Sequence, residues 1–166
     1  MQLNFLVTAL AALVPLVLGF IWYNPKVLGN IWMNESGMTM EKAKGASMPL
    51  LMILGYVFSF MIALAMNFVV VHQYHVYSIL IDEPGFGDPN SAVGKLVADF
   101  MSKYGQNYRT FKHGALHGTI TGILMILPII ANNALYERKS FKYIAISAGY
   151  WIINLALIGG IISAFA

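Results

Sequence analysis

Long apolar runs separated by shorter polar stretches dominate the pattern of this sequence. The runs lie at about 3–23, 49–71, 113–136 and 143–165. Each is long enough to cross the hydrocarbon of a bilayer as an α-helix, which takes about 20 residues. The pattern therefore predicts an all-α membrane protein, a bundle of four transmembrane helices that forms a single domain over residues 1–166.

The first run has the features of a retained membrane helix. It lacks a basic segment at its start and a small-residue cleavage site at its end, which a secretory signal peptide would have. Pro15 is expected to kink the helix because proline removes a backbone donor and crowds the preceding turn. Trp22 and Tyr23 suit a membrane interface, and Pro25 ends the helix.

A fifth, amphipathic helix is predicted at about 91–104, between helices two and three. Ser91 is a suitable N-cap and Gly105 a suitable stop. One face is apolar at helical spacing, and Lys95, Asp99 and Lys103 occupy the other. The segment is too short and too charged to span, so we expect it to lie on the membrane or to shield the ends of the bundle. Thr39 predicts a further N-cap, for a short helix in the first loop.

The composition supports a membrane protein and excludes several classes of site. Hydrophobic residues make up 58% of the chain and charged residues 10%, against about 25% charged residues in soluble domains. With no cysteine, the chain can form neither disulfides nor thiolate metal sites. The net charge of +3 is spread out, so nucleic acid is not an expected partner. The expected partner is the lipid bilayer.

The distribution of basic residues predicts an orientation. Six lie with the first and third loops and four with the second loop: Lys26, Lys42, Lys44, Arg138, Lys139 and Lys142 against Lys95, Lys103, Arg109 and Lys112. Because cytoplasmic loops carry the excess of Lys and Arg, both termini and the 76–112 loop are expected outside the cytoplasm. The expected location is the bacterial cytoplasmic (inner) membrane.

The four histidines form two pairs, His72 with His75 and His113 with His117. Spacings of three and four place each pair on one helix face, and the predicted topology brings both pairs to the same end of the bundle. Two facing pairs can bind a transition metal or supply the axial ligands of a haem, with Asp82, Glu83 or Asp99 as a possible carboxylate ligand. The alternative is that the rings only hydrogen-bond at the membrane interface.

Small residues at four-residue spacing predict close helix packing. Gly114, Gly118 and Gly122 form one stripe in helix three, and helix four carries Gly149 and Gly160 in stripes of its own. Such stripes let two helix backbones approach in lipid. We expect the contact within the chain, against helix four, with a contact between subunits as the alternative.

Four asparagines supply the polar groups expected inside the membrane: Asn67, Asn132, Asn133 and Asn154. An amide in hydrocarbon needs a hydrogen-bond partner, so these side chains are expected to face other helices or to line a path for a small neutral solute. The sequence contains no nucleophile triad, phosphate loop or dinucleotide motif.

Three stretches of the chain resemble a known family. They are Trp22-Tyr23-Asn24-Pro25 with Gly29 and Trp32-Met33, then His113-Gly114-Ala115-Leu116-His117-Gly118, then Leu135-Tyr136-Glu137-Arg138-Lys139 with Gly149-Tyr150-Trp151. They are similar to the small bacterial membrane proteins grouped as domain-of-unknown-function family 1761. The resemblance covers most of the chain outside the second loop. It implies a multi-pass bacterial membrane protein and no activity.

Three functions remain open. The leading expectation is a non-enzymatic membrane protein, either a homo-oligomer or an accessory subunit of a larger membrane complex, because small-residue stripes are present and catalytic motifs are not. The second is a metal- or haem-binding redox or sensor protein that uses the four histidines. The third is a channel or carrier for a small neutral solute.

Overall fold

The computed structural model describes residues 2–166, and helices are the only regular elements in this range. The helices are α1 (Phe5–Ala11), α2 (Val14–Trp22), α3 (Gly29–Ser36), α4 (Met40–Lys44), α5 (Met48–Val70), α6 (Gln73–Leu80), α7 (Ala92–Tyr104), α8 (Phe111–Thr121), the π-helical segment η1 (Gly122–Ile126), α9 (Leu127–Tyr136) and α10 (Phe141–Phe165). Four stretches are long and apolar enough to cross a membrane: Phe5–Trp22, Met48–Val70, Phe111–Tyr136 and Phe141–Phe165. The predicted all-α fold with four spanning helices is confirmed.

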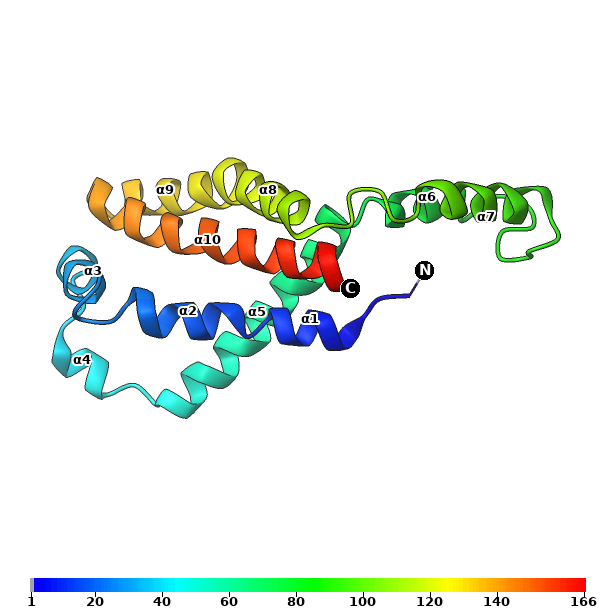
Figure 1. Ribbon diagram of the computed structural model, residues 1–166. Helices are drawn as coiled ribbons and strands as arrows, with labels where there is room; N and C mark the ends of the chain where they lie inside the picture. The colour runs from blue at the N-terminus through cyan, green and yellow to red at the C-terminus, as the bar shows by residue number, and fades with distance from the viewer. Residues whose placement is uncertain (1) are drawn as a thin grey trace.

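Helix α10 is the central element of the bundle. In its most apolar stretch 56% of the residues are buried, against 11% to 22% in the other three spans. It packs against the segments α1–α2, α5 and α8–α9, as Figure 1 shows. The hydrophobic core lies between α1, α5 and α10. Its buried members are Ala11, Ala12, Ala63, Met66, Val70, Val71, Leu155, Ile158 and Ile162.

The closest helix contact joins α8 to α10. A methyl group added at Gly114 would lie 2.0 Å from the backbone oxygen of Gly159, and one added at Gly118 would lie 2.0 Å from the backbone oxygen of Leu155. Gly122 continues the contact at Ile152, where an added methyl would lie 2.8 Å from the Cα atom. The glycine stripe is therefore used inside the chain, against helix four.

The two glycines expected to pack in helix four have aromatic neighbours. An added methyl at Gly160 would lie 2.6 Å from the ring of Phe111, and one at Gly149 would lie 3.4 Å from the ring of Trp22. The backbone partner of Gly114 is instead Gly159, one residue before Gly160.

Pro15 and Pro128 each lie at an interruption of a spanning helix. The first span is broken at Ala12–Leu13, between α1 and α2, and Pro15 lies in the first turn of α2. This confirms the predicted kink, because Pro15 cannot donate to the carbonyl one turn before it. Pro128 follows η1, where the third span widens into a π-helix, another common site of helix distortion.

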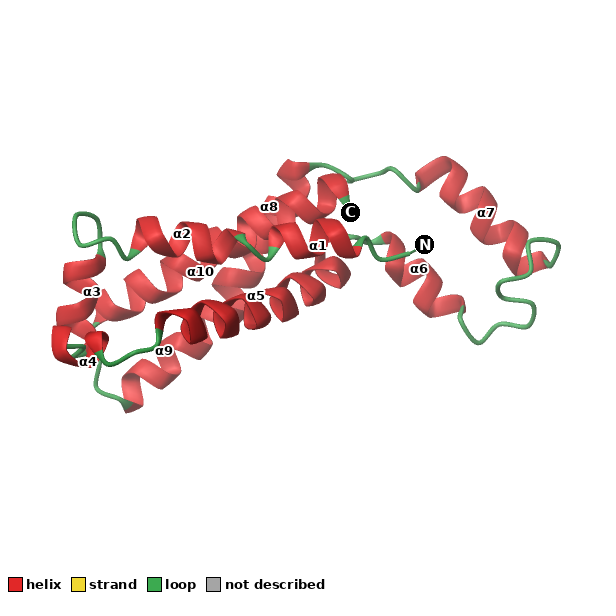
Figure 2. Cartoon of the chain, turned by 90° about the horizontal axis from the view of Figure 1, so that it is seen from below, coloured by secondary structure: helices red, strands yellow, loops and turns green. Residues whose placement is uncertain are grey.

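Helices α6 and α7 form a hairpin that projects from one end of the bundle (Figures 1 and 2). The predicted N-cap of α7 is confirmed, since Ser91 Oγ accepts from Gly94 N at 2.9 Å, and the Thr39 cap of α4 accepts from Lys42 N at 3.2 Å. Helix α7 packs against α6. Of the two positions expected for it, it does not take the one that shields the ends of the spanning helices. Helix α6 was not predicted, because no proline or glycine marks the break at Val71 that separates it from α5.

Each end of the bundle is closed by contacts between distant segments. At the end with the hairpin, Tyr74 Oη donates to Gln2 O at 3.3 Å, and both chain termini lie there in Figure 1. At the other end, Lys139 Nζ donates to Ser36 O and Ser140 Oγ donates to Glu35. The second loop and the termini thus share one side, and the first and third loops share the other.

The glycine contact gives a direct test of the fold. Gly118→Ala should lower the free energy of unfolding by about 1–3 kcal/mol or more, because the new methyl forces α8 away from α10. Denaturation of the protein in detergent micelles measures this loss. Gly45→Ala is the matched control, since its added methyl would have its nearest neighbour, Lys42 O, at 3.6 Å. Equal denaturation midpoints for the two variants would contradict the close contact between α8 and α10.

Candidate metal centre

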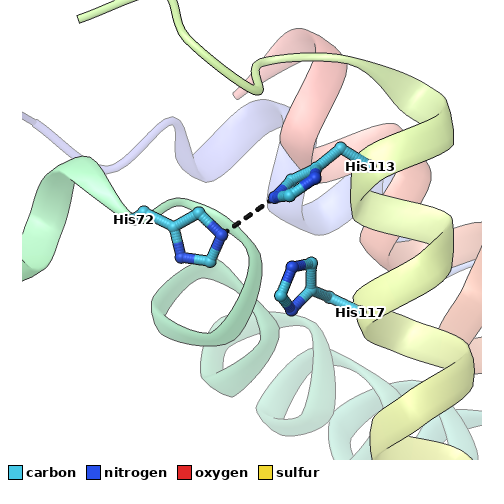
Figure 3. Close-up of side chains that lie close together, drawn as sticks. All are labelled: His72, His113 and His117. Carbon is cyan, nitrogen blue, oxygen red and sulfur yellow. Dashed lines mark hydrogen bonds between the residues drawn. The ribbon is translucent and has the colours of Figure 1, made fainter. Parts of the chain in front are cut away.

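Three of the four histidines converge at the end of the bundle that carries the hairpin. His72 follows the end of α5, and His113 and His117 lie one turn apart at the start of α8. Their rings point toward one another in Figure 3, and one ring nitrogen of each lies within 4.8 Å of the other two. The closest pair is His72 Nε2 and His113 Nε2, at 2.9 Å.

The local sequence explains why His113 and His117 face His72. Thr110 caps α8 by accepting from His113 N at 3.3 Å, which sets where the helix begins. A spacing of four residues then places both rings on one face. His72 comes directly after Val71, where the chain leaves α5 with non-helical angles, so the break in α5 turns its ring toward α8.

The link between the hairpin and α8 is hydrogen-bonded to the start of α6 and to the end of α10. Gln73 Nε2 donates to Asn107 O at 2.9 Å, and Ser163 Oγ donates to Tyr108 O at 3.1 Å. Arg109 donates to the carbonyls of Ser163 and Ala166 at the end of α10. Burial lowers the pKa of Arg109, yet guanidinium stays protonated at neutral pH, so these are charge-assisted bonds.

Tyr108 is a neighbour of the site that the sequence did not reveal. Its ring lies over that of His113 with centroids 4.8 Å apart, and its φ of 62° is uncommon for any residue other than glycine. The hydrogen bond that Ser163 Oγ donates to the carbonyl of Tyr108 holds this conformation. Neither Tyr108 nor Gln73 belongs to a motif or a periodic pattern, so only the folded chain identifies them.

His75 and the acidic candidates stand outside the cluster. His75 is exposed, and its ring stacks on His72 at a centroid distance of 6.4 Å, but none of its nitrogens joins the close group. Asp99 pairs with Lys103 at 3.0 Å on the exposed surface of α7. Within residues 2–166 the close group of potential ligands consists of His72, His113 and His117, without the carboxylates of Asp82 and Glu83.

The environment favours neutral imidazoles. Burial lowers the pKa of His72, and the neighbouring rings of His117, His113 and His75 lower it further because a second positive charge would be repelled. The contact between His72 and His113 needs one ring to donate and the other to accept. A neutral imidazole with a free lone pair is the form that binds a metal ion.

The comparison with protein families now has a structural context. A family model described as "Protein of unknown function (DUF1761)" matches residues 6–163. The chain belongs to this family. The match confirms the resemblance drawn from the sequence and extends across the second loop, including all four histidines. No curated protein and no solved structure matches the chain.

The asparagines of this DUF1761 protein do not share one path. Asn67 and Asn154 are fully buried, and their amides donate to carbonyls four residues earlier, Ala63 O at 3.0 Å and Tyr150 O at 2.9 Å. Asn67 also donates to Thr8 Oγ1 at 3.1 Å, joining α5 to α1. Asn132 and Asn133 are exposed on α9. The side-chain oxygens of Asn67 and Asn154 have no hydrogen-bond partner within the described residues, and the four asparagines divide between the core and the outer surface.

The hydrogen bonds from Arg109 to the end of α10 give a prediction for stability. Arg109→Gln removes the charge-assisted bonds to the end of α10 and should cost about 1.5–3 kcal/mol of unfolding free energy. Lys112→Gln, at an exposed position close by, is the control and should leave the denaturation midpoint unchanged. A midpoint for Arg109→Gln equal to that of the wild type would show that the link is not held in this way.

Proposed function

We propose that this DUF1761 protein is a membrane protein that binds a transition-metal ion through His72, His113 and His117. The observation that carries the proposal is the approach of three imidazole nitrogens to within 4.8 Å of one another. Metal–imidazole bonds of 2.0–2.1 Å in tetrahedral geometry place ligand nitrogens about 3.3 Å apart. The nitrogens of the cluster, 2.9 Å apart for His72 and His113 and all within 4.8 Å, are close to that spacing.

A single ion suits the cluster better than a haem. Two axial imidazoles on opposite sides of an iron would have their nitrogens about 4 Å apart, if iron–nitrogen bonds are near the 2 Å of other metal–imidazole bonds. His72 Nε2 and His113 Nε2 lie 2.9 Å apart, and His117 extends from α8 beside His113 toward the same point (Figure 3). The donors therefore surround one small volume instead of facing each other across a porphyrin.

The ligand set indicates the class of metal and the type of site. Three imidazoles without carboxylate or thiolate suit zinc, copper, nickel or iron, and not magnesium or calcium, which prefer oxygen. Structural zinc sites have four protein ligands, whereas sites with three leave a position for water or an exchangeable ligand. The proposed site is of the second, open type.

The geometry adds no support for the oligomer or the solute path. The glycines that suggested a contact between copies are buried against α10 of the same chain. The asparagines that suggested a path divide between the core and the outer surface. The three-histidine cluster is the arrangement that favours a specific function.

Substitution of single histidines tests the proposal. In detergent-purified protein at neutral pH, His72→Ala, His113→Ala and His117→Ala should each weaken binding of Zn²⁺ by more than the roughly 10–100-fold caused by loss of an outer-shell partner. Competition with a chromophoric chelator measures the affinity, and elemental analysis the stoichiometry. His75→Ala is the matched control and should bind like the wild type. Equal binding by all four variants, or none by the wild type, would end the proposal.

We also propose that the site lies outside the cytoplasm. The six basic residues of the first and third loops, against four in the second, support this orientation. It would place the histidines where they take metal from the extracytoplasmic side.

The absence of cysteine from the sequence allows a clean test of this orientation. In intact bacterial cells, a membrane-impermeant maleimide should label Ser78→Cys directly and Lys44→Cys only after the membrane is permeabilised. The unsubstituted chain is the blank. The reverse labelling pattern would place the histidine site on the cytoplasmic side.

A further inference from the structure

A second candidate site lies in the hairpin, separate from the three histidines. A pocket of about 650 Å³ lies between α6 and α7, and the 86–89 loop covers part of it. Most of its lining is apolar or aromatic, including Tyr77, Ile81, Phe86, Val97, Ala98 and Met101. Its volume and lining are those of a ligand site, which is typically about 300–1,000 Å³ and mostly apolar.

The pocket is continuous with the membrane-facing surface of the bundle. Phe68 forms part of its wall and belongs to α5, two residues before that spanning helix ends. The Phe68 side chain is 48% exposed and its ring packs against that of Tyr74, at a centroid distance of 5.5 Å. Because Phe68 lies in the last turn of a spanning helix, the pocket begins at the end of that helix and extends between α6 and α7.

We propose that this pocket binds one acyl chain of a membrane phospholipid. A chain that passes from the bilayer along Phe68 stays in apolar surroundings, and it covers pocket surface that would otherwise face water. The exposed polar side chains of His75, Ser78 and Asp88 also line the pocket and leave a headgroup in contact with water.

The size of the pocket favours a hydrocarbon chain over a partner helix. An α-helix with its side chains is at least 10 Å across, so 650 Å³ holds only about one and a half turns. A flexible chain one methylene wide can fill the same volume without such a limit. The inference does not rest on metal binding, since none of the three clustered histidines lines this pocket.

Photo-crosslinking in a bilayer tests the proposal. The full chain is reconstituted into phosphatidylcholine vesicles that contain a small fraction of phosphatidylcholine with a diazirine at the end of one acyl chain. After illumination, mass spectrometry locates the labelled residues. We expect labels on Phe86, Val97 and Met101 in the hairpin as well as on the lipid-facing residues Leu124 and Met125.

Variants that fill the pocket separate specific binding from general contact with lipid. Ala98→Phe, and Ser78→Phe from the opposite wall, should lose the pocket labels and keep those on Leu124 and Met125. Ala92→Phe is the matched control, on the same helix but outside the pocket, and should keep both sets.

Three outcomes would overturn the proposal. The first is a hairpin without labels in the wild type. The second is labelling of the outward residue Leu96 as strong as that of Val97 and unchanged in Ala98→Phe, which would mean that the hairpin lies flat on the bilayer. The third is labelling of the pocket residues by a second copy of the chain in a protein–protein crosslinking experiment, with no lipid label there.

Discussion

The close contact between α8 and α10 is the interaction on which the rest of the structure depends. Gly114 and Gly118 present bare backbone to Gly159 and Leu155, so the two helices meet without intervening side chains. In lipid, where apolar side chains gain little by leaving one apolar phase for another, such close packing is a main source of helix association. It fixes the rotation of α8 about its axis and so decides where His113 and His117 point.

The histidine cluster results from that rotation together with the break in α5. Were α5 to continue as one helix through Val71, His72 would follow its helical path instead of leaving it. The link formed by Asn107, Tyr108 and Arg109 is bonded to the end of α10 through Ser163 and the last carbonyl, and to the start of α6 through Gln73. The site is thus built from two helix ends and one short pinned segment, all at the same end of the bundle.

The hairpin adds an element that the bundle does not need for its own packing. Helix α7 contacts α6 and leaves Leu96 exposed, while Phe100 and Tyr104 line a pocket beside Val76 of α6. Its amphipathic pattern correctly predicts a helix with an apolar face, but the partner of that face is α6, a helix that the pattern did not reveal. An amphipathic period reports that one face is covered and is silent on what covers it.

Local physical chemistry determined much of this protein from the sequence by itself. Run length and hydropathy predicted the four spans, Ser91 and Thr39 predicted helix starts, and Pro15 predicted a broken first span, because each effect acts between residues close along the chain. The tertiary structure alone decided that Gly114 meets Gly159 and not Gly160, that His72 joins His113 and His117 while His75 does not, and that Asn132 and Asn133 face outward. These outcomes depend on the rotation and offset of whole helices, which follow from packing contacts summed over the bundle and not from any local pattern.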